Sequence, residues 1–307
     1  MRPFDASTAI VVSDGGLATE LEARGHDLSD DLWSARLLMD APEEIIAAHL
    51  AFFQAGAVIA TTASYQASFG GFARHGLSRA EATGLMRRSV ALAQSARDRL
   101  AGDGTARWVA ASVGPYGAAL ADGAEYRGRY GLSVADLTAW HRPRLEVLAD
   151  AGPDLLAVET IPDADEAEAL LTALSGLPVP AWLSYTIDGD RTRAGQPLDA
   201  AFALANGVPE VIAVGVNCCD PADVPAAIDI ARRVTSKPVI VYPNSGERWD
   251  AQRRTWASQP GSAGRSAFAA GQAEQWAAQG AGIIGGCCRV RPADIAQVAT
   301  AAAGQSC

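Results

Sequence analysis

Four of the five cysteines in this sequence form two adjacent pairs, Cys218-Cys219 and Cys287-Cys288. Zinc favours soft sulfur ligands, and a catalytic zinc site uses three protein ligands and keeps a fourth position for water or substrate. Thiolates from Cys218, Cys287 and Cys288 would form a half-open tetrahedral site of this kind. The alternative is that these cysteines are small buried apolar residues, which are common in protein cores.

Two glycines, Gly285 and Gly286, directly precede the second cysteine pair. Glycine adopts backbone torsions that other residues avoid, so the two glycines would let successive side chains be aimed at one point. Cys219 is expected to point away from Cys218, because neighbours on an extended backbone face opposite sides, and to be structural. Cys307 is the last residue and is given no role.

Two carboxylates stand beside features that suit an amino-acid ligand. Asp14 begins an Asp-Gly-Gly turn, and Glu159 follows the apolar run Leu155–Val158. Two acids would bind an ammonium group, and the N–H groups of Gly15 and Gly16 would cradle a carboxylate. Two alternatives stay open: Asp14 as a helix cap or Asx turn, and Glu159 as the partner of an arginine.

Aromatic residues accompany these groups and would bind a cationic methyl donor through cation–π contacts. Packing within loops is the alternative for any one of them. The residues are Tyr65, Tyr116, Tyr126, Tyr130, Tyr242, Trp249 and Trp256.

The elements that must position these residues alternate along the chain. Eight short apolar runs read as strands: 10–13, 58–62, 108–113, 155–159, 181–186, 211–216, 239–242 and 282–285. Segments of helical period lie between them, including one that begins at Pro42 and those at 79–100, 163–174, 222–234 and 292–303. Eight buried parallel strands with intervening helices predict a (β/α)8 TIM barrel.

A doubly wound sheet is the rival fold, but the first turn, from Asp14 to Glu20, lacks the G-x-G-x-x-G spacing of a nucleotide-binding fold. In a barrel, Asp14, Tyr65, Glu159, the Asn217-Cys218 pair and Cys287-Cys288 all lie at strand ends, so they converge on one face. The stretches 116–130 and 245–264 read as long loops over that face.

Length and charge limit the class of protein. The 307 residues suit one barrel domain over 1–307. A net charge of −10 argues against binding to nucleic acid. The sequence has neither a signal peptide nor a run of about 20 apolar residues, so we expect a cytoplasmic protein without a membrane partner. Cysteines stay reduced there, and their clusters indicate metal or catalysis.

Seven segments, in order, resemble the homocysteine S-methyltransferase family over about residues 10 to 291. They are Asp14–Glu22, Thr62–Ser68, Ser112–Ala118, Glu159–Pro162, Gly215–Cys218, Tyr242–Glu247 and Gly285–Arg289. The resemblance implies a (β/α)8 barrel enzyme with one catalytic zinc ion, bound by Cys218, Cys287 and Cys288. It also implies that Asp14 and Glu159 hold the amino group of homocysteine and that Gly15 and Gly16 contact its carboxylate. Tyr65 and Asn217 complete the expected substrate contacts.

The resemblance further implies methyl transfer from a sulfonium donor to homocysteine thiolate, giving methionine. The loops resemble the branch that uses S-methylmethionine, with S-adenosylmethionine as a second possible donor. The alternatives are a betaine-dependent or other thiol or selenol methyltransferase on the same barrel, and a zinc-binding or thiol-binding module without catalysis. The protein is expected to be a monomer or a homodimer.

Overall fold

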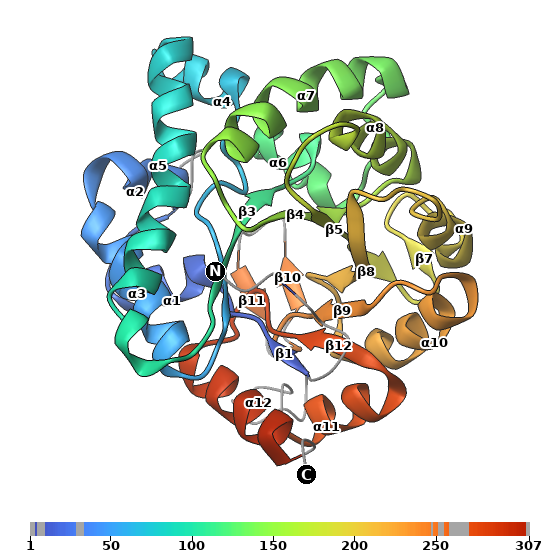
Figure 1. The fold of residues 1–307 in the computed structure, drawn as a ribbon. Helices are drawn as coiled ribbons and strands as arrows, with labels where there is room; N and C mark the ends of the chain where they lie inside the picture. Colours follow the sequence, from blue (N-terminus) through green and yellow to red (C-terminus); the bar gives the residue numbers. More distant parts are fainter. Residues whose placement is uncertain are drawn as a thin grey trace.

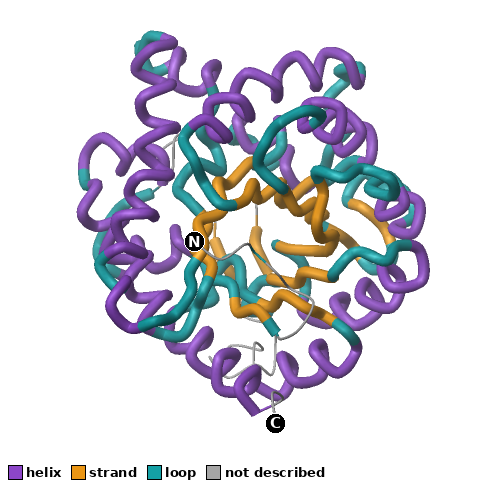
Figure 2. Tube along the Cα trace, in the orientation of Figure 1, coloured by secondary structure: helices purple, strands orange, loops and turns teal. Residues whose placement is uncertain are grey.

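The structure is a computed structural model, and it describes residues 4, 10–28, 34–246, 248–250, 255–257 and 270–304. One eight-stranded parallel sheet forms its centre, and helices surround the strands (Figures 1 and 2). The strands are β1 (Val11–Val12), β2 (Ile59–Thr61), β3 (Trp108–Val113), β4 (Leu155–Ile161), β5 (Ala181–Tyr185), β8 (Val211–Asn217), β9 (Val239–Tyr242) and β12 (Ala281–Ile284).

The sheet closes on itself. Its strand order is β1-β12-β9-β8-β5-β4-β3-β2, and a parallel bridge between Ser13 and Ile59 joins the last strand to the first. Every strand of this sheet overlaps one of the predicted apolar runs, and the barrel prediction is confirmed. β4 continues past its predicted end at Glu159 to Ile161, and β8 continues past Val216 to include Asn217.

Helices follow the strands around the outside of the barrel. They are α1 (Leu17–Ala23), α2 (Ser34–Asp40), α3 (Pro42–Gln54), α4 (Phe69–Arg74), α5 (Arg79–Asp98), α6 (Tyr116–Leu120), α7 (Val134–Asp150), α8 (Ala164–Leu174), α9 (Leu198–Ala203), α10 (Val224–Val234), α11 (Ala270–Gln279) and α12 (Pro292–Gly304). Local signals set several starts: Pro42 opens α3, Ser78 and Glu81 form a capping box on α5, and Asp163 caps α8. The described helices include none that is long and apolar enough to cross a membrane.

Every second side chain of a strand points into the barrel, and these inward-pointing side chains form two layers along the barrel axis. The deeper layer is apolar and includes Ile59, Ala110, Ala157, Trp182 and Ile240. Side chains two positions further along a strand point to the same side of the sheet. Polar residues occupy those next positions, namely Thr61, Ser112, Glu159, Ser184 and Tyr242. The barrel therefore carries a polar layer towards the carboxyl ends of its strands.

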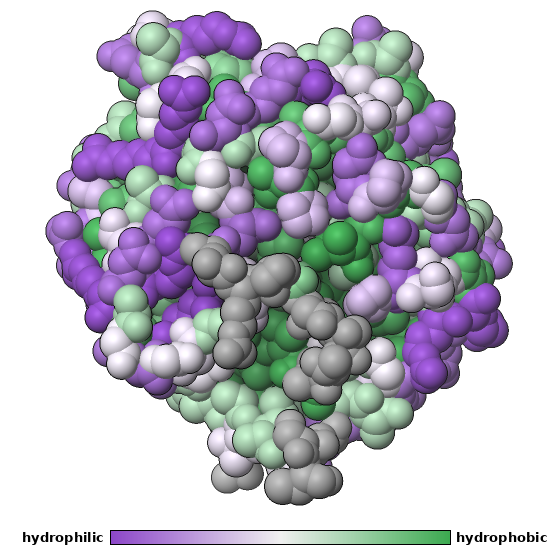
Figure 3. All heavy atoms as spheres, in the orientation of Figure 1, coloured by the Kyte–Doolittle hydropathy of each residue, from purple (hydrophilic) through white to green (hydrophobic). Residues whose placement is uncertain are grey.

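The two long loops contain elements of their own. The 116–130 stretch holds α6 and the short 3-10 helix η2 (Ala124–Tyr126), and the 245–264 stretch holds the antiparallel pair β10 (Arg248–Asp250) and β11 (Thr255–Ala257). The rest of the second stretch lies outside the described residues. A further hairpin, β6 (Ile187–Asp188) and β7 (Arg191–Thr192), follows β5. On the face drawn in Figure 3, hydrophobic residues gather near the middle and hydrophilic residues around the rim.

Candidate active site

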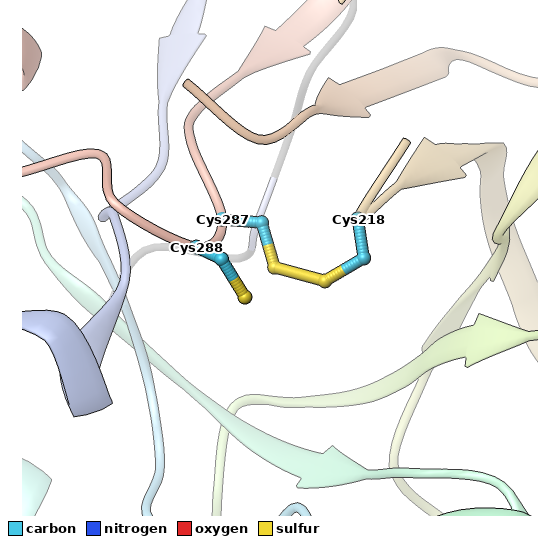
Figure 4. Close-up of side chains that lie close together, drawn as sticks. All are labelled: Cys218, Cys287 and Cys288. Carbon is cyan, nitrogen blue, oxygen red and sulfur yellow. A yellow bond between two sulfur atoms is a disulfide. The ribbon is translucent and has the colours of Figure 1, made fainter. Parts of the chain in front are cut away.

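Three cysteine sulfurs meet at the ends of β8 and β12. The Sγ atoms of Cys218, Cys287 and Cys288 all lie within 4.8 Å of one another (Figure 4). Three ligands of a tetrahedral zinc site with Zn–S bonds of about 2.3 Å lie about 3.8 Å apart, so this spacing suits a metal. Cys219 lies outside the cluster and is buried in the core between barrel and helices, as its place beside Cys218 predicted.

Cys218 and Cys287 are joined by a disulfide in this structure, with their Cα atoms 5.6 Å apart, while Cys288 is free. Burial, together with the charges of Glu22 and Glu125, raises the pKa of the Cys288 thiol to about 12. No positive side chain is among the causes of this shift. A thiolate here therefore needs a bound cation, and the chemistry of the donor set fits a metal ion once the disulfide is reduced.

The backbone around both cysteine pairs is held by the segment that follows β9. The Cys287 N–H donates to the Pro243 carbonyl at 2.8 Å, and Asn244 accepts from the Cys288 N–H at 3.2 Å through Oδ1. The N–H of Asn244 donates to the Cys219 carbonyl at 3.0 Å. Asn244 therefore ties the two strand ends together. This role of Asn244 was not identified in the sequence analysis.

The reason expected for Gly285 and Gly286 is wrong. Neither has a positive φ, so neither is needed for a left-handed turn. A Cβ on Gly285 would lie 2.8 Å from the Asp14 carbonyl, and one on Gly286 would lie 2.2 Å from a Val290 methyl. Gly285 is required because it packs against the chain around Asp14, and Gly286 because it packs against the side chain of Val290. By contrast, Cys218 itself has a φ of +48°.

Asp14 is buried at the end of β1 and is held by β2. Its Oδ2 accepts the Thr61 N–H at 2.6 Å, and its Oδ1 accepts the Thr61 hydroxyl at 2.9 Å. Burial raises the pKa of Asp14 to about 7; the hydrogen bonds from Thr61 oppose that shift, and the nearby charge of Glu159 adds to it. The alternative of a helix cap does not hold, because α1 begins after Gly16 without a side-chain cap.

Glu159 is buried in the polar layer, close enough to Asp14 for their charges to interact. Its Oε1 accepts a hydrogen bond from the Ser112 hydroxyl. Burial raises the pKa of Glu159 to about 7, against hydrogen bonds from Ser112 and Tyr242 that lower it. None of the described arginines forms an ion pair with Glu159, so the two acids are a buried pair that a cationic ligand would stabilise.

Gly15 and Gly16 make a close approach to the cysteine loop. A Cβ on Gly16 would lie 2.6 Å from the Cys287 carbonyl, and one on Gly15 would lie 2.6 Å from the Val290 carbonyl. The Gly16 N–H donates to that Val290 carbonyl at 2.9 Å. It is therefore engaged within the fold, and of the two glycines Gly15 stays the candidate for contact with a substrate carboxylate.

Asn217 and Tyr65, the other two expected substrate contacts, occupy different positions. The Asn217 amide is fully buried and bonded to Thr160 and Ser184. These bonds favour a positioning role over direct substrate contact. Tyr65 is partly buried, and a hydrogen bond with Thr160 is one influence on its pKa, which burial holds well above the usual value. Tyr65 therefore stays a candidate for substrate contact.

A buried polar network lies behind Tyr65. Arg144 on α7 donates to the Gly114 carbonyl at 2.9 Å and to the Tyr65 carbonyl at 3.1 Å. Glu166 on α8 accepts the Tyr116 N–H at 2.6 Å, and its Oε1 lies 2.9 Å from His141 Nε2. Sequence reasoning left these residues out. Charged residues on barrel helices usually face solvent, so their types and spacing carry no signal of this contact.

The expected aromatic group is only partly gathered at the site. Tyr242 interacts with Glu159, and Tyr126 interacts with Cys288. Tyr116 and Tyr130 pack on each other, with ring centroids 5.2 Å apart, beside Glu166. Trp249 and Trp256 pair across β10 and β11, and their side chains lie outside the described residues.

Comparison with known proteins agrees with this geometry. A sequence profile described as homocysteine S-methyltransferase matches residues 11–302. A homocysteine S-methyltransferase from Escherichia coli is 48% identical over 293 residues, covering 94% of this chain and 93% of its own.

Solved structures of a relative match the fold over nearly its whole length. The metallated form of the homocysteine methyltransferase MmuM from Escherichia coli has a TM-score of 0.85 at 45% identity, covering 95% of this chain and 96% of its own. The oxidized form of the same protein has a TM-score of 0.84 at 46% identity, with 95% of both chains covered. A metallated and an oxidized form of one relative therefore share the fold that brings Cys218, Cys287 and Cys288 together here.

Proposed function

This chain belongs to the homocysteine S-methyltransferase family and is an enzyme of that activity, and we propose that S-methylmethionine is its methyl donor and zinc its metal. The observation that carries the proposal is the cluster of three sulfurs within 4.8 Å at one end of the barrel. Two buried carboxylates lie at the same end. A site with three thiolates, a vacant fourth ligand position and an ammonium pocket suits a thiol amino acid.

Cys218, Cys287 and Cys288 would hold the zinc ion. When bound, zinc would supply a fourth ligand position for the homocysteine sulfur and lower the pKa of that thiol. The three cysteines would keep the site electron-rich, because they carry more negative charge than one zinc ion balances. Asn244 and Pro243 fix the backbone that carries them.

The acceptor's amino-acid end would be bound by Asp14 and Glu159. Their buried carboxyls would ionise fully on contact with the substrate ammonium, which replaces the missing counter-charge. Thr61 and Ser112 hold the two carboxyls in place through hydrogen bonds. Gly15 would contact the substrate carboxylate. These contacts orient the acceptor sulfur towards the barrel axis, and alignment of two reactants accounts for much of the rate of such a transfer.

A sulfonium donor suits this site because its positive charge is lost as the methyl group leaves. The methyl carbon moves to the homocysteine sulfur, and the bond electrons stay on the donor sulfur as a neutral thioether. With S-methylmethionine, both products are methionine. The proposal needs no general base, in agreement with the positions of His49 and His141, which are buried on helices of the outer ring.

A donor panel tests the proposal. Reduced, zinc-loaded protein is incubated with homocysteine and either S-methylmethionine, S-adenosylmethionine or betaine, and methionine formation is measured with and without a chelator. We expect the fastest turnover with S-methylmethionine and loss of turnover with the chelator. Faster turnover with betaine, or turnover that the chelator leaves unchanged, would overturn the donor or the metal respectively. Metal binding without methyl transfer from any donor would indicate a non-catalytic module.

A further inference from the structure

Arg193 lies in the segment between β5 and α9 and is not among the residues assigned to the acceptor. It follows the short strand β7. Its N–H donates to the Thr186 carbonyl at 3.3 Å, and the Thr186 hydroxyl donates to the Cys218 carbonyl at 3.1 Å. One residue therefore separates the backbone of Arg193 from that of a metal-ligand candidate.

The side chain of Arg193 lies over an aromatic ring that borders the same cluster. Its guanidinium carbon is 5.9 Å from the centroid of the Tyr126 ring. The Tyr126 phenol interacts with the Cys288 sulfur. Tyr126 and Arg193 thus form a contacting pair of side chains between Cys288 and the backbone beside Cys218.

Hydrogen bonds between three loops hold this pair of side chains in place. The Arg129 N–H donates to Asp163 Oδ2 at 3.0 Å, and Gln196 Nε2 donates to Asp163 Oδ1 at 2.5 Å. The Ala194 N–H donates to the Pro162 carbonyl at 2.9 Å. Asp163 therefore joins the loop of Tyr126 to the loop of Arg193, so their relative position is built into the fold.

The guanidinium of Arg193 keeps one unpaired donor, although its charge also interacts with Asp223. Its Nε is buried and has no hydrogen-bond partner among the described residues. A buried guanidinium N–H without an acceptor is costly, and an anionic ligand would supply that acceptor. Arg289 directly follows Cys288 in the sequence, but it is exposed and interacts with Glu22.

The proposed reaction needs an anion site of this kind. Both S-methylmethionine and homocysteine carry an α-carboxylate, and the acceptor's amino-acid end belongs with Asp14, Glu159 and Gly15. We infer that Arg193 binds the carboxylate of the amino-acid methyl donor, with the Tyr126 ring beside the sulfonium. This inference rests on the proposed function and assigns Arg193 a role in donor selection.

This inference is tested by assaying two forms of the enzyme with two forms of the donor, in all four combinations. Wild-type and Arg193→Met proteins are assayed with S-methylmethionine and with its carboxamide, in which the carboxylate is replaced by a neutral amide. We expect Arg193→Met to lower kcat/KM for S-methylmethionine by about 10- to 100-fold, the range for a lost charge-assisted hydrogen bond, through a raised donor KM. For the carboxamide the loss should be less than about threefold, and the KM for homocysteine should stay unchanged. Arg193→Lys should recover part of the loss.

The matched control is Arg191→Met, on the same hairpin. Arg191 is exposed and donates to the Gly195 carbonyl at 2.9 Å, and its substitution should leave both donors unaffected. Equal losses with S-methylmethionine and the carboxamide would overturn the inference, because they would show a structural role. So would a loss carried by Arg289→Met and not by Arg193→Met. If the wild type fails to use S-methylmethionine, the proposed donor is wrong, which is a separate result.

Discussion

Asn217 holds Thr160 through both atoms of its amide. Its Oδ1 accepts the Thr160 N–H at 2.7 Å, and its Nδ2 donates to the Thr160 hydroxyl at 2.7 Å. Thr160 has a φ of +59°, a region that is strongly unfavourable for a β-branched residue. The two bonds therefore hold a strained turn in place directly after Glu159, and they couple the end of β8 to the end of β4.

Replacement of Asn217 by alanine should release that turn. Asn217→Ala leaves a buried N–H and two buried hydroxyls without their partner, and we expect it to lower the free energy of unfolding by about 2–4 kcal/mol. The kcat for methyl transfer should also fall, because Glu159 loses its fixed direction. Urea unfolding measures the first effect. Ser184→Ala, which removes one donor to the same Oδ1, is the control and should cost about 1 kcal/mol. An Asn217→Ala protein as stable as that control would contradict this account.

The zinc content of cysteine variants tests the ligand set. Reduced wild-type protein should hold about one zinc ion per chain, and Cys288→Ala should hold only a small fraction of that amount, because two thiolates are a poor zinc site. Elemental analysis after gel filtration gives the ratio. Cys219→Ala is the matched control, since Cys219 is buried in the outer core beside Cys218, and it should keep its zinc. Full zinc and full activity in Cys288→Ala would remove Cys288 from the site.

Reduction should decide whether the metal binds at all. Cys218 and Cys287 are joined by a disulfide here, and a disulfide sulfur is not a thiolate ligand. We expect oxidised protein to take up almost no zinc and to regain uptake after treatment with dithiothreitol. Free thiols and bound zinc are measured on the same samples. Cys219→Ala keeps all three ligand candidates and should lose and regain zinc as the wild type does. Full zinc uptake by protein shown to contain the disulfide would contradict the assignment.

One physical reason explains why both the barrel and the convergence of the cysteines could be predicted from the sequence. Buried parallel strands are continuous apolar runs, and the residue types at their ends stand out against them. The ligand candidates on β8 and β12 could therefore be placed without knowing any side-chain contact. The same logic predicted that Asp14 and Glu159 would share a face with them.

The partners of those residues could not be predicted in the same way. Thr61 holds Asp14 because β1 and β2 meet in one particular register, and Ser112 holds Glu159 because of the register between β3 and β4. Register depends on all the strands of the closed sheet together. The roles of Gly285 and Gly286 also depend on how closely two loops approach, which a single sequence does not reveal.

Glu166 should be the most sensitive charged residue outside the barrel interior. It is fully buried and accepts from the Tyr116 N–H, from the Tyr130 hydroxyl at 3.2 Å and from His141. Glu166→Ala leaves these donors unpaired and removes the charge that interacts with Arg144. We therefore expect it to lower the free energy of unfolding by about 3–5 kcal/mol. Glu168→Ala, an exposed residue on the same helix, should change stability by less than about 0.5 kcal/mol. Urea unfolding of the two variants side by side measures the difference, and equal stabilities would contradict the prediction.

The paired carboxyls give the unliganded protein a defined dependence on pH. Burial raises the pKa of both Asp14 and Glu159 to about 7, so the fold favours their protonated forms. Their contribution to stability is therefore fully present below about pH 4 and is lost as the pH rises through about 7. A bound ammonium group reverses this preference, because it favours the ionised forms.

Binding of an amino acid should consequently strengthen as the pH rises through 7. L-methionine, the expected product, is a suitable probe because it has no thiol and keeps its ammonium group protonated over this range. If one carboxyl with a pKa of about 7 must ionise, affinity should be about tenfold higher at pH 8 than at pH 6, measured by calorimetry on reduced, zinc-loaded protein. Asp14→Asn removes one of the two titrating groups and should bind more weakly at pH 8. It should also show a shallower pH dependence, because only one of the two carboxyls with a raised pKa remains to titrate. An affinity for L-methionine that stays constant between pH 6 and pH 8 in the wild-type protein would mean that these carboxyls do not hold the ammonium group.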